Sequence, residues 1–136
     1  MSYVIGIDLG GTKIEGVLMN EHNKVTKLIR RPTEAHKGKK QVIANILKVI
    51  NDLRIKKIKA IGIGIPGFVN EKGKIIHMPH ILKLIGVNLH SELKKKIKEK
   101  IVIDNDANCF SLAEQKLGAA KNYKHVVGVI IGTGVG

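Results

Sequence analysis

Residues 5–16, IGIDLGGTKIEG in one-letter code, restrict the possible folds of this chain more than any other segment. A short apolar strand carries one carboxylate, Asp8, and then breaks at two consecutive glycines before an extended run resumes. Glycines allow backbone N–H groups to approach a ligand closely, and a hydroxyl and an ammonium group follow directly. The segment therefore predicts a phosphate-binding loop, with Asp8 at its mouth holding Mg²⁺ through water. The residues of this loop are Gly10, Gly11, Thr12 and Lys13.

Two better-known phosphate-binding patterns do not fit their surroundings in this sequence. Gly6 and Gly11 have the spacing of a P-loop, but the lysine and the hydroxyl residue that follow are in reversed order. A strand-like run then follows where a P-loop needs a helix. A literal G-x-G-x-x-G over residues 62–67 contains Pro66 and leads into a turn-rich segment, which argues against dinucleotide binding. A tight hairpin turn remains the alternative explanation for the paired glycines.

Composition limits the function classes that need to be considered. The 136 residues suffice for one domain, and they contain no run of 18 apolar residues and no basic-then-apolar leader. The net charge of +13 comes mostly from lysine, and aromatic residues make up only 3%, which is not typical of sequence-specific nucleic-acid binding. A single cysteine, Cys109, cannot form an internal disulfide, which favours a cytoplasmic protein. We therefore expect neither a membrane nor a nucleic acid as the partner.

Hydrophobic periodicity predicts three successive strands and then alternating helices and strands, with a small hairpin around residues 71–73. The predicted strands cover residues 2–9, 14–20, 25–30, 58–65, 101–103 and 126–131, and the predicted helices cover residues 38–54, 91–100 and 107–117. Three antiparallel strands followed by parallel strands with helical crossovers form the mixed α/β sheet of the ribonuclease-H-like fold. Such sheets place ligands at the carboxyl ends of their strands, so Asp8, Gly67 and residues 104–106 are expected along one edge.

The segment VIDNDANC, residues 102–109, places three polar side chains between a buried strand and the start of a helix. At the helix N-terminus Asp106 is favoured in its ionised form, which suits accepting the proton of a substrate hydroxyl during phosphoryl transfer. A purely structural role of Asp106 as an N-cap is the alternative. Asn105 offers a donor and an acceptor for orienting a polyol, and Asp104 is expected to brace the turn.

A third segment, AIGIGIPG over residues 60–67, ends a predicted buried strand. Pro66 fixes a bend, and Gly67 leaves room for a ligand against bare backbone, although a strand end needs no function. In the loop that follows, His77 and His80 flank a Met-Pro pair and are candidates for lining a substrate pocket. These histidines and His90 lack cysteine or acidic partners at the spacing of a zinc site.

Together these motifs resemble the N-terminal half of the ROK family of sugar kinases, in the superfamily of actin, hexokinase and Hsp70. The resemblance covers essentially all 136 residues, with four motifs in the family's order. They are DLGGTKIEG, GIGIPG, DNDANCF and IIGTGVG. The last three are especially similar to bacterial N-acetylglucosamine kinases, and glucokinases and fructokinases share most of them.

The resemblance implies an actin-like ATPase domain and a role for each matching residue. Asp106 would be the base that takes the proton from the 6-hydroxyl of the sugar, and Asn105 and Gly67 would contact the sugar ring. Asp8 would help to hold Mg²⁺. Many members have an asparagine at the position of His77, so the identity of the sugar stays open. The residues that would cradle the phosphates of ATP are Gly10, Gly11, Thr12, Lys13, Thr133 and Gly134.

The resemblance also implies a division of the chain. Residues 1–120 would form the N-terminal kinase domain, and residues 121–136 the first strand and the start of the second phosphate loop of a C-terminal domain. In the family that second domain carries the adenosine pocket and a zinc site. We therefore expect a truncated or split kinase with little activity alone, whose residues 126–131 pair with a separate C-terminal half or a second copy. The alternative is a non-catalytic remnant that binds a sugar, a nucleotide or a partner. No DNA-reading module precedes the first predicted strand, which favours a kinase over a repressor.

Overall fold

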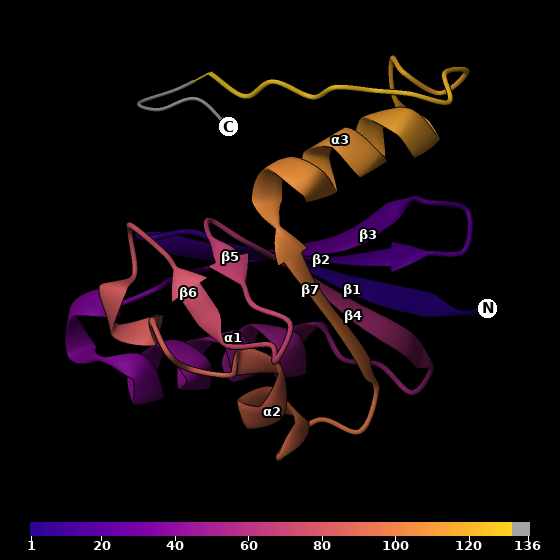
Figure 1. Cartoon of the computed structure of the whole chain (residues 1–136). Coiled ribbons are helices and arrows are strands. Elements are labelled where there is room, and N and C mark those ends of the chain that lie inside the picture. The colour runs from indigo at the N-terminus through magenta and orange to yellow at the C-terminus, as the bar shows by residue number, and fades with distance from the viewer. Residues whose placement is uncertain (132–136) are drawn as a thin grey trace.

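The computed structural model describes residues 1–131, which form a five-stranded mixed sheet and three helices (Figure 1). The strands are β1 (Tyr3–Leu9), β2 (Lys13–Asn20), β3 (Val25–Pro32), β4 (Ile58–Ile65), β5 (Phe68–Val69), β6 (Ile75–His77) and β7 (Lys100–Asn105), and the helices are α1 (Lys39–Leu53), α2 (Leu89–Lys94) and α3 (Asp106–Leu117). The sheet order is β3-β2-β1-β4-β7, and β5 pairs with β6 in a separate hairpin. The first three strands are antiparallel, and β1, β4 and β7 are parallel. The mixed topology predicted from the sequence is confirmed.

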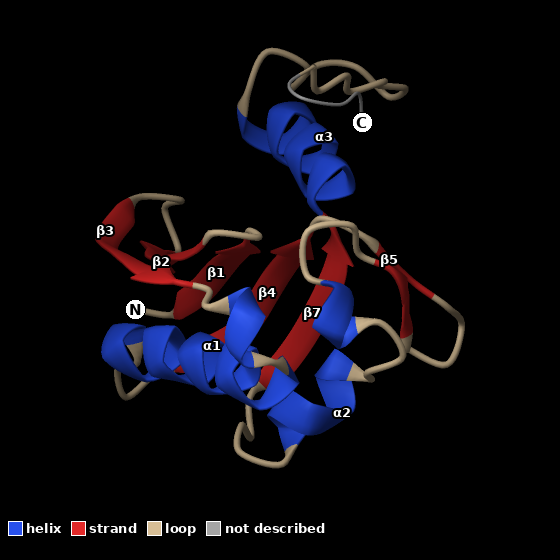
Figure 2. Cartoon of the chain, turned by 90° about the vertical axis from the view of Figure 1, so that its left-hand side faces the viewer, coloured by secondary structure: helices blue, strands red, loops and turns tan. Residues whose placement is uncertain are grey.

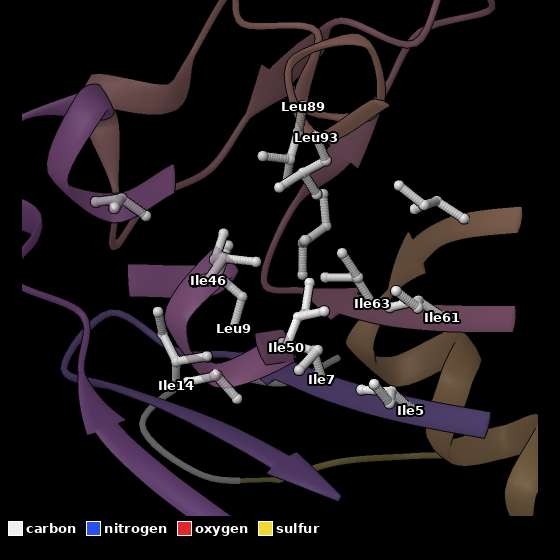
Figure 3. Close-up of a cluster of buried hydrophobic side chains, with 14 of the residues drawn as sticks. Ile5, Ile7, Leu9, Ile14, Ile46, Ile50, Ile61, Ile63, Leu89 and Leu93 are labelled. Carbon is white, nitrogen blue, oxygen red and sulfur yellow. The ribbon is translucent and has the colours of Figure 1, made fainter. Parts of the chain in front are cut away.

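The core lies on one face of the sheet, which α1 and α2 cover (Figure 2). Alternate residues of β1 and β4 point to this face, and the apolar stripe of α1 packs on them. Burying each large side chain contributes about 1.5–3 kcal/mol. Figure 3 shows the central side chains, among them Ile5, Ile7, Leu9, Ile14, Ile46, Ile50, Ile61 and Ile63.

Gly16 of β2 allows α1 to approach the sheet closely. A Cβ atom at this position would lie 2.7 Å from the Cδ1 atom of Leu53 and would overlap the side chain of Val49. Gly16, the last glycine of the IGIDLGGTKIEG segment, is therefore structural, since it lies under the helix and outside the loop.

Two elements differ from their predicted ranges. The helix predicted over residues 91–100 begins at Leu89 because the Asn88 side chain accepts a hydrogen bond from the N–H of Ser91 at 3.0 Å, and it ends at Lys94. The chain then reverses direction within residues 95–99 to enter β7. That strand is longer than predicted, since its pairing with β4 continues as far as Asn105.

The prediction of a strand over residues 126–131 is wrong, because residues 126–130 form no strand. A strand is stable only when its N–H and C=O groups pair with a neighbour, and this segment instead runs along α3, where Gly128 packs against Ser111. The side chains of Val127 and Ile131 are 89% and 79% exposed.

None of the helices in residues 1–131 combines the length and the apolar character needed to cross a bilayer.

Candidate active site

A row of residues crosses the sheet near the carboxyl ends of its parallel strands. Asp8 of β1 lies opposite Gly64 of β4, and Gly64 lies opposite Asp104 of β7. On the other side of Asp8, Glu15 of β2 continues the row and is ion-paired with Arg30 of β3. Residues in register share a face, so these side chains point away from the core. The edge predicted to collect the polar candidates does collect them.

The start of α3 lies over Gly64, in the middle of this row. A Cβ atom at Gly64 would lie 3.7 Å from the Cα atom of Asp106 and 3.6 Å from the Sγ atom of Cys109. These are ordinary van der Waals distances, so the first turn of α3 lies directly over Gly64, which stands between Asp8 and Asp104 in the row. Figure 2 shows α3 rising from the edge at which the parallel strands end.

Asn105, and not Asp106, is the N-cap of α3. Its Oδ1 atom accepts hydrogen bonds from the N–H groups of Ala107 and Asn108, at 3.0 and 3.4 Å. Its Nδ2 atom donates to the carbonyl oxygen of Gly67 at 3.1 Å. Asp106 accepts only one bond within residues 1–131, from the N–H of Ala107 to Oδ1 at 2.8 Å. The N-cap alternative therefore does not account for Asp106.

Asp104 has the bracing role expected of it. Its Oδ1 atom accepts hydrogen bonds from the N–H of Asn105 at 2.7 Å and from the Nδ2 atom of Asn108 at 3.0 Å. These contacts fix the turn between β7 and α3.

A cleft of about 710 Å³ opens between this row of residues and α3. Its polar lining consists of Asp8, Glu15, Asp104, Asp106 and Asn108. Burial, and then the negative charges of Asp106 and Glu15, raise the pKa of Asp8 above its ordinary value of 3.8, and Lys13 offsets part of this rise. Burial and the three aspartates likewise raise the pKa of the Cys109 thiol. The cleft is thus a concentration of negative charge in a protein whose net charge is +13.

This charge pattern fits a cation that is bound mainly through water. Within residues 1–131, no three His, Cys, Asp or Glu side chains converge to bind a metal ion directly. Magnesium in phosphate-binding sites keeps several waters and uses one or two carboxylates together with the phosphates of the ligand. Asp8 and its acidic neighbours provide carboxylates of this kind.

Replacing Asp8 by asparagine is expected to stabilise the fold at neutral pH and not at acid pH. Because the pKa of Asp8 is raised, the folded state favours the protonated carboxyl; that stabilisation is complete below pH 3.8 and is lost as the pH rises through the folded-state pKa. Asparagine has no charge to desolvate. Thermal unfolding in EDTA at about pH 3 and about pH 7 should show a gain in Tm for Asp8→Asn at the higher pH alone. An equal difference at both pH values would contradict this origin.

The predicted phosphate loop is the turn between β1 and β2. Hydrogen bonds engage some of its backbone N–H and carbonyl groups and not others. The N–H of Gly10 donates to the carbonyl oxygen of Lys13 at 2.9 Å. The carbonyl oxygens of Gly10 and Thr12 accept bonds from the hydroxyl and the N–H of Thr33, at 2.6 and 2.9 Å. The N–H groups of Gly11 and Thr12 donate to no group in residues 1–131. The side chains of Thr12 and Lys13 are exposed.

The segment after β4 packs against this loop. A Cβ atom at Gly11 would lie 2.7 Å from the Cβ atom of His80, so His80 closes one side of the loop. His77 is exposed, and its ring stacks on Phe68 with 6.2 Å between ring centroids. A Cβ atom at Gly67 would overlap the carbonyl oxygen of His77. The space beside Gly67, which we expected a ligand to use, is therefore filled by the backbone of β6.

Three residues at the site were not singled out from the sequence. Glu15 enters the row through strand register, Thr33 bonds to the phosphate loop from the end of β3, and Asn45 of α1 bonds to Thr33. Only the pairing of segments far apart in sequence reveals them. Of the other candidates, Thr133 and Gly134 lie outside the described residues.

Comparison with known proteins agrees with these features. A model of the ROK family matches residues 4–136. A glucokinase from Thermotoga maritima is 35% identical over 135 residues, which are 98% of this chain and 43% of that protein. An N-acetyl-D-glucosamine kinase from Mannheimia succiniciproducens is 31% identical over 133 residues, which are 96% of this chain and 43% of that protein.

The fold matches as well. The structure of a ROK family glucokinase from Streptomyces griseus, in complex with glucose and AMPPNP, has a TM-score of 0.87 at 25% identity and covers 99% of this chain and 43% of that chain. This likeness confirms the α/β fold class expected from the sequence. The chain spans less than half the length of these three relatives. Because the family model covers nearly the whole sequence, the chain belongs to the ROK family.

Proposed function

We propose that this chain provides one side of the active site of a sugar kinase. The reaction would be ATP-dependent phosphorylation of a hexose or N-acetylhexosamine at its 6-hydroxyl. The observation that supports it best is the position of Asp106, which is half-buried at the start of α3 and faces the same acidic cleft as Asp8. The named activities of the relatives, glucokinase and N-acetyl-D-glucosamine kinase, belong to the same reaction class.

The residues of the site would have distinct roles in this reaction. Asp106 accepts the proton of the sugar hydroxyl as the hydroxyl oxygen bonds to the γ-phosphorus of ATP and the bond from that phosphorus to the leaving ADP breaks. The phosphate loop binds phosphate oxygens through the N–H groups of Gly11 and Thr12 and the ammonium group of Lys13. Asp8 would hold Mg²⁺ through water, and the ion would supply positive charge that offsets the negative charge of the phosphates.

Sugar contacts are assigned to the segment that joins β4 to α2 and to the start of α3. Asn105 is held by Gly67 and caps α3, so its role is to fix the turn that presents Asp106 as well as to meet the sugar. His77 lines the sugar side from the hairpin of β5 and β6, and its identity contributes to the choice between sugars.

The division at residue 120 is part of the same proposal. Residues 1–120 form the first kinase domain, and residues 121–136 begin a second one, with Thr133 and Gly134 on the opposing phosphate loop. In this arrangement the strand of residues 126–131 forms only when a C-terminal half or a second copy pairs with it, which agrees with its irregular form here. The chain alone is expected to turn over slowly, since it matches only 43% of the kinases named above. We place the reaction in the cytoplasm.

A turnover assay with Mg-ATP and a panel of hexoses and N-acetylhexosamines tests the proposed function. The complete enzyme, meaning this chain together with a C-terminal half, should phosphorylate at least one sugar, and residues 1–136 alone should do so far more slowly. Sugar binding without turnover in both proteins would favour the non-catalytic alternative. Fast turnover by residues 1–136 would contradict the division of the site between two halves.

A further inference from the structure

Two buried polar residues, Thr33 and Asn45, are hydrogen-bonded to each other directly behind the phosphate loop. They are 0% and 4% exposed, and they are the only buried polar residues within residues 1–131. Removing a polar group from water is costly unless the group is hydrogen-bonded, so a polar pair inside an apolar core is an expensive arrangement. The position of this pair indicates what it does.

Thr33 follows the last residue of β3 and extends the pairing of β3 toward the loop. Its hydroxyl donates to the carbonyl oxygen of Gly10 at 2.6 Å, and its N–H donates to the carbonyl oxygen of Thr12 at 2.9 Å. One residue thus holds two carbonyl groups of the four-residue loop.

Asn45 of α1 fixes the position of Thr33. Its Nδ2 atom donates to the carbonyl oxygens of Pro32 and Thr33, both at 3.2 Å, and to the Oε2 atom of Glu34 at 2.9 Å. Gln41 donates to the Oδ1 atom of Asn45 at 3.0 Å. Glu34 has a positive φ of 55°, a conformation that a non-glycine residue keeps only when its surroundings impose it. The network therefore holds the chain rigidly immediately behind the loop.

This arrangement matters for an anionic ligand because the two kinds of backbone group act in opposite directions. Carbonyl oxygens carry partial negative charge and repel phosphate, whereas N–H groups attract it. In this loop Thr33 engages two carbonyl oxygens from behind, and the N–H groups of Gly11 and Thr12 have no partner in residues 1–131. We infer that Thr33, fixed in place by Asn45, is a positioning residue that turns two carbonyl groups of the phosphate loop away from bound phosphate. The inference rests on the proposed function of this loop.

Substitution of Thr33 by valine tests the role of the hydroxyl, because valine has nearly the same shape. The loss leaves the half-buried carbonyl oxygen of Gly10 without this partner, so hydrogen–deuterium exchange of residues 9–14 is expected to accelerate roughly tenfold or more. Thr33→Ser keeps the hydroxyl and should restore slow exchange. In the complete enzyme, Thr33→Val should raise the KM for ATP about tenfold and change kcat and the KM for sugar by less than about threefold.

Thr26→Val is the matched control. The Thr26 hydroxyl donates to the carbonyl oxygen of Leu18 at 3.1 Å, in the same pair of strands and far from the loop. This variant should leave exchange in residues 9–14 and the KM for ATP unchanged. If Thr33→Val does not fold, Asn45→Ala provides the same exchange readout with the hydroxyl in place, and a smaller acceleration is expected.

The two readouts separate this inference from the proposed function. A parent protein that turns over no sugar would overturn the kinase proposal, while the exchange of the loop would still decide the role of Thr33. Wild-type exchange in Thr33→Val, failure of Thr33→Ser to restore it, or an equal effect of Thr26→Val would overturn the inference.

Discussion

Asp106→Asn is expected to lower kcat of the complete enzyme by about 10²–10⁴-fold, the range for removal of a general base. The KM for sugar should change little, because the amide keeps the size of the carboxyl group and one of its two acceptor oxygens. Asparagine also keeps the Oδ1 acceptor for the N–H of Ala107, so the start of α3 should persist. The lost charge removes a favourable interaction with the helix N-terminus, about 0.3–1 kcal/mol, and also the repulsion of Asp8; thermal unfolding measures the net change separately.

Asp104→Asn provides the comparison, since Asp104 lines the same cleft two residues away. Its Oδ1 atom accepts bonds from Asn105 and Asn108, and an amide oxygen can replace it in both. A much smaller loss of kcat is expected. Equal losses in the two variants would mean that the negative potential of the cleft matters and that Asp106 has no special part in proton transfer.

The topology of the sheet was predictable because the sequence features that indicate it are local. The three opening strands are separated by short turns, and the apolar run of residues 58–65 is typical of a strand buried in a parallel sheet. The end of α2 and the irregular tail were not predictable in this way. The first depends on where β7 takes up its pairing with β4, and the second on whether residues 126–131 have a neighbouring strand.

The candidate site was likewise predictable only where local sequence features determine it. Asp8 lies near the carboxyl end of β1 and Asp106 directly follows β7, so the rule that ligands bind at carboxyl ends was enough to bring them together. Glu15 and Thr33 depend on register between β2 and its two neighbours, and no spacing in the sequence encodes that register. The interpretation of Gly67 failed for a related reason: a glycine at a strand end shows that something approaches the backbone closely, but not whether it is a ligand or another strand.

Gly67→Ala tests the structural explanation for that glycine and is expected to destabilise the fold. The added Cβ atom would overlap the carbonyl oxygen of His77 and would lie 3.1 Å from its carbonyl carbon. Backbone cannot rotate away as a side chain can, so a cost at the upper end of the 1–3 kcal/mol range for overpacking is expected, or about 3 kcal/mol. Chemical denaturation of residues 1–136 measures this change as a lower midpoint with an unchanged m-value.

Gly62→Ala is the matched control, because Gly62 lies on β4, the strand that precedes Gly67, and no atom lies within 4 Å of the added Cβ. It should change the free energy of unfolding by no more than about 0.5 kcal/mol. Because Gly67 also accepts the bond from Asn105, and because His80 in the following segment packs on Gly11, the damage from Gly67→Ala should reach both sides of the site. Sugar and nucleotide affinities should therefore fall together in that variant. A loss of sugar affinity alone, with stability unchanged, would instead support direct contact between Gly67 and the sugar.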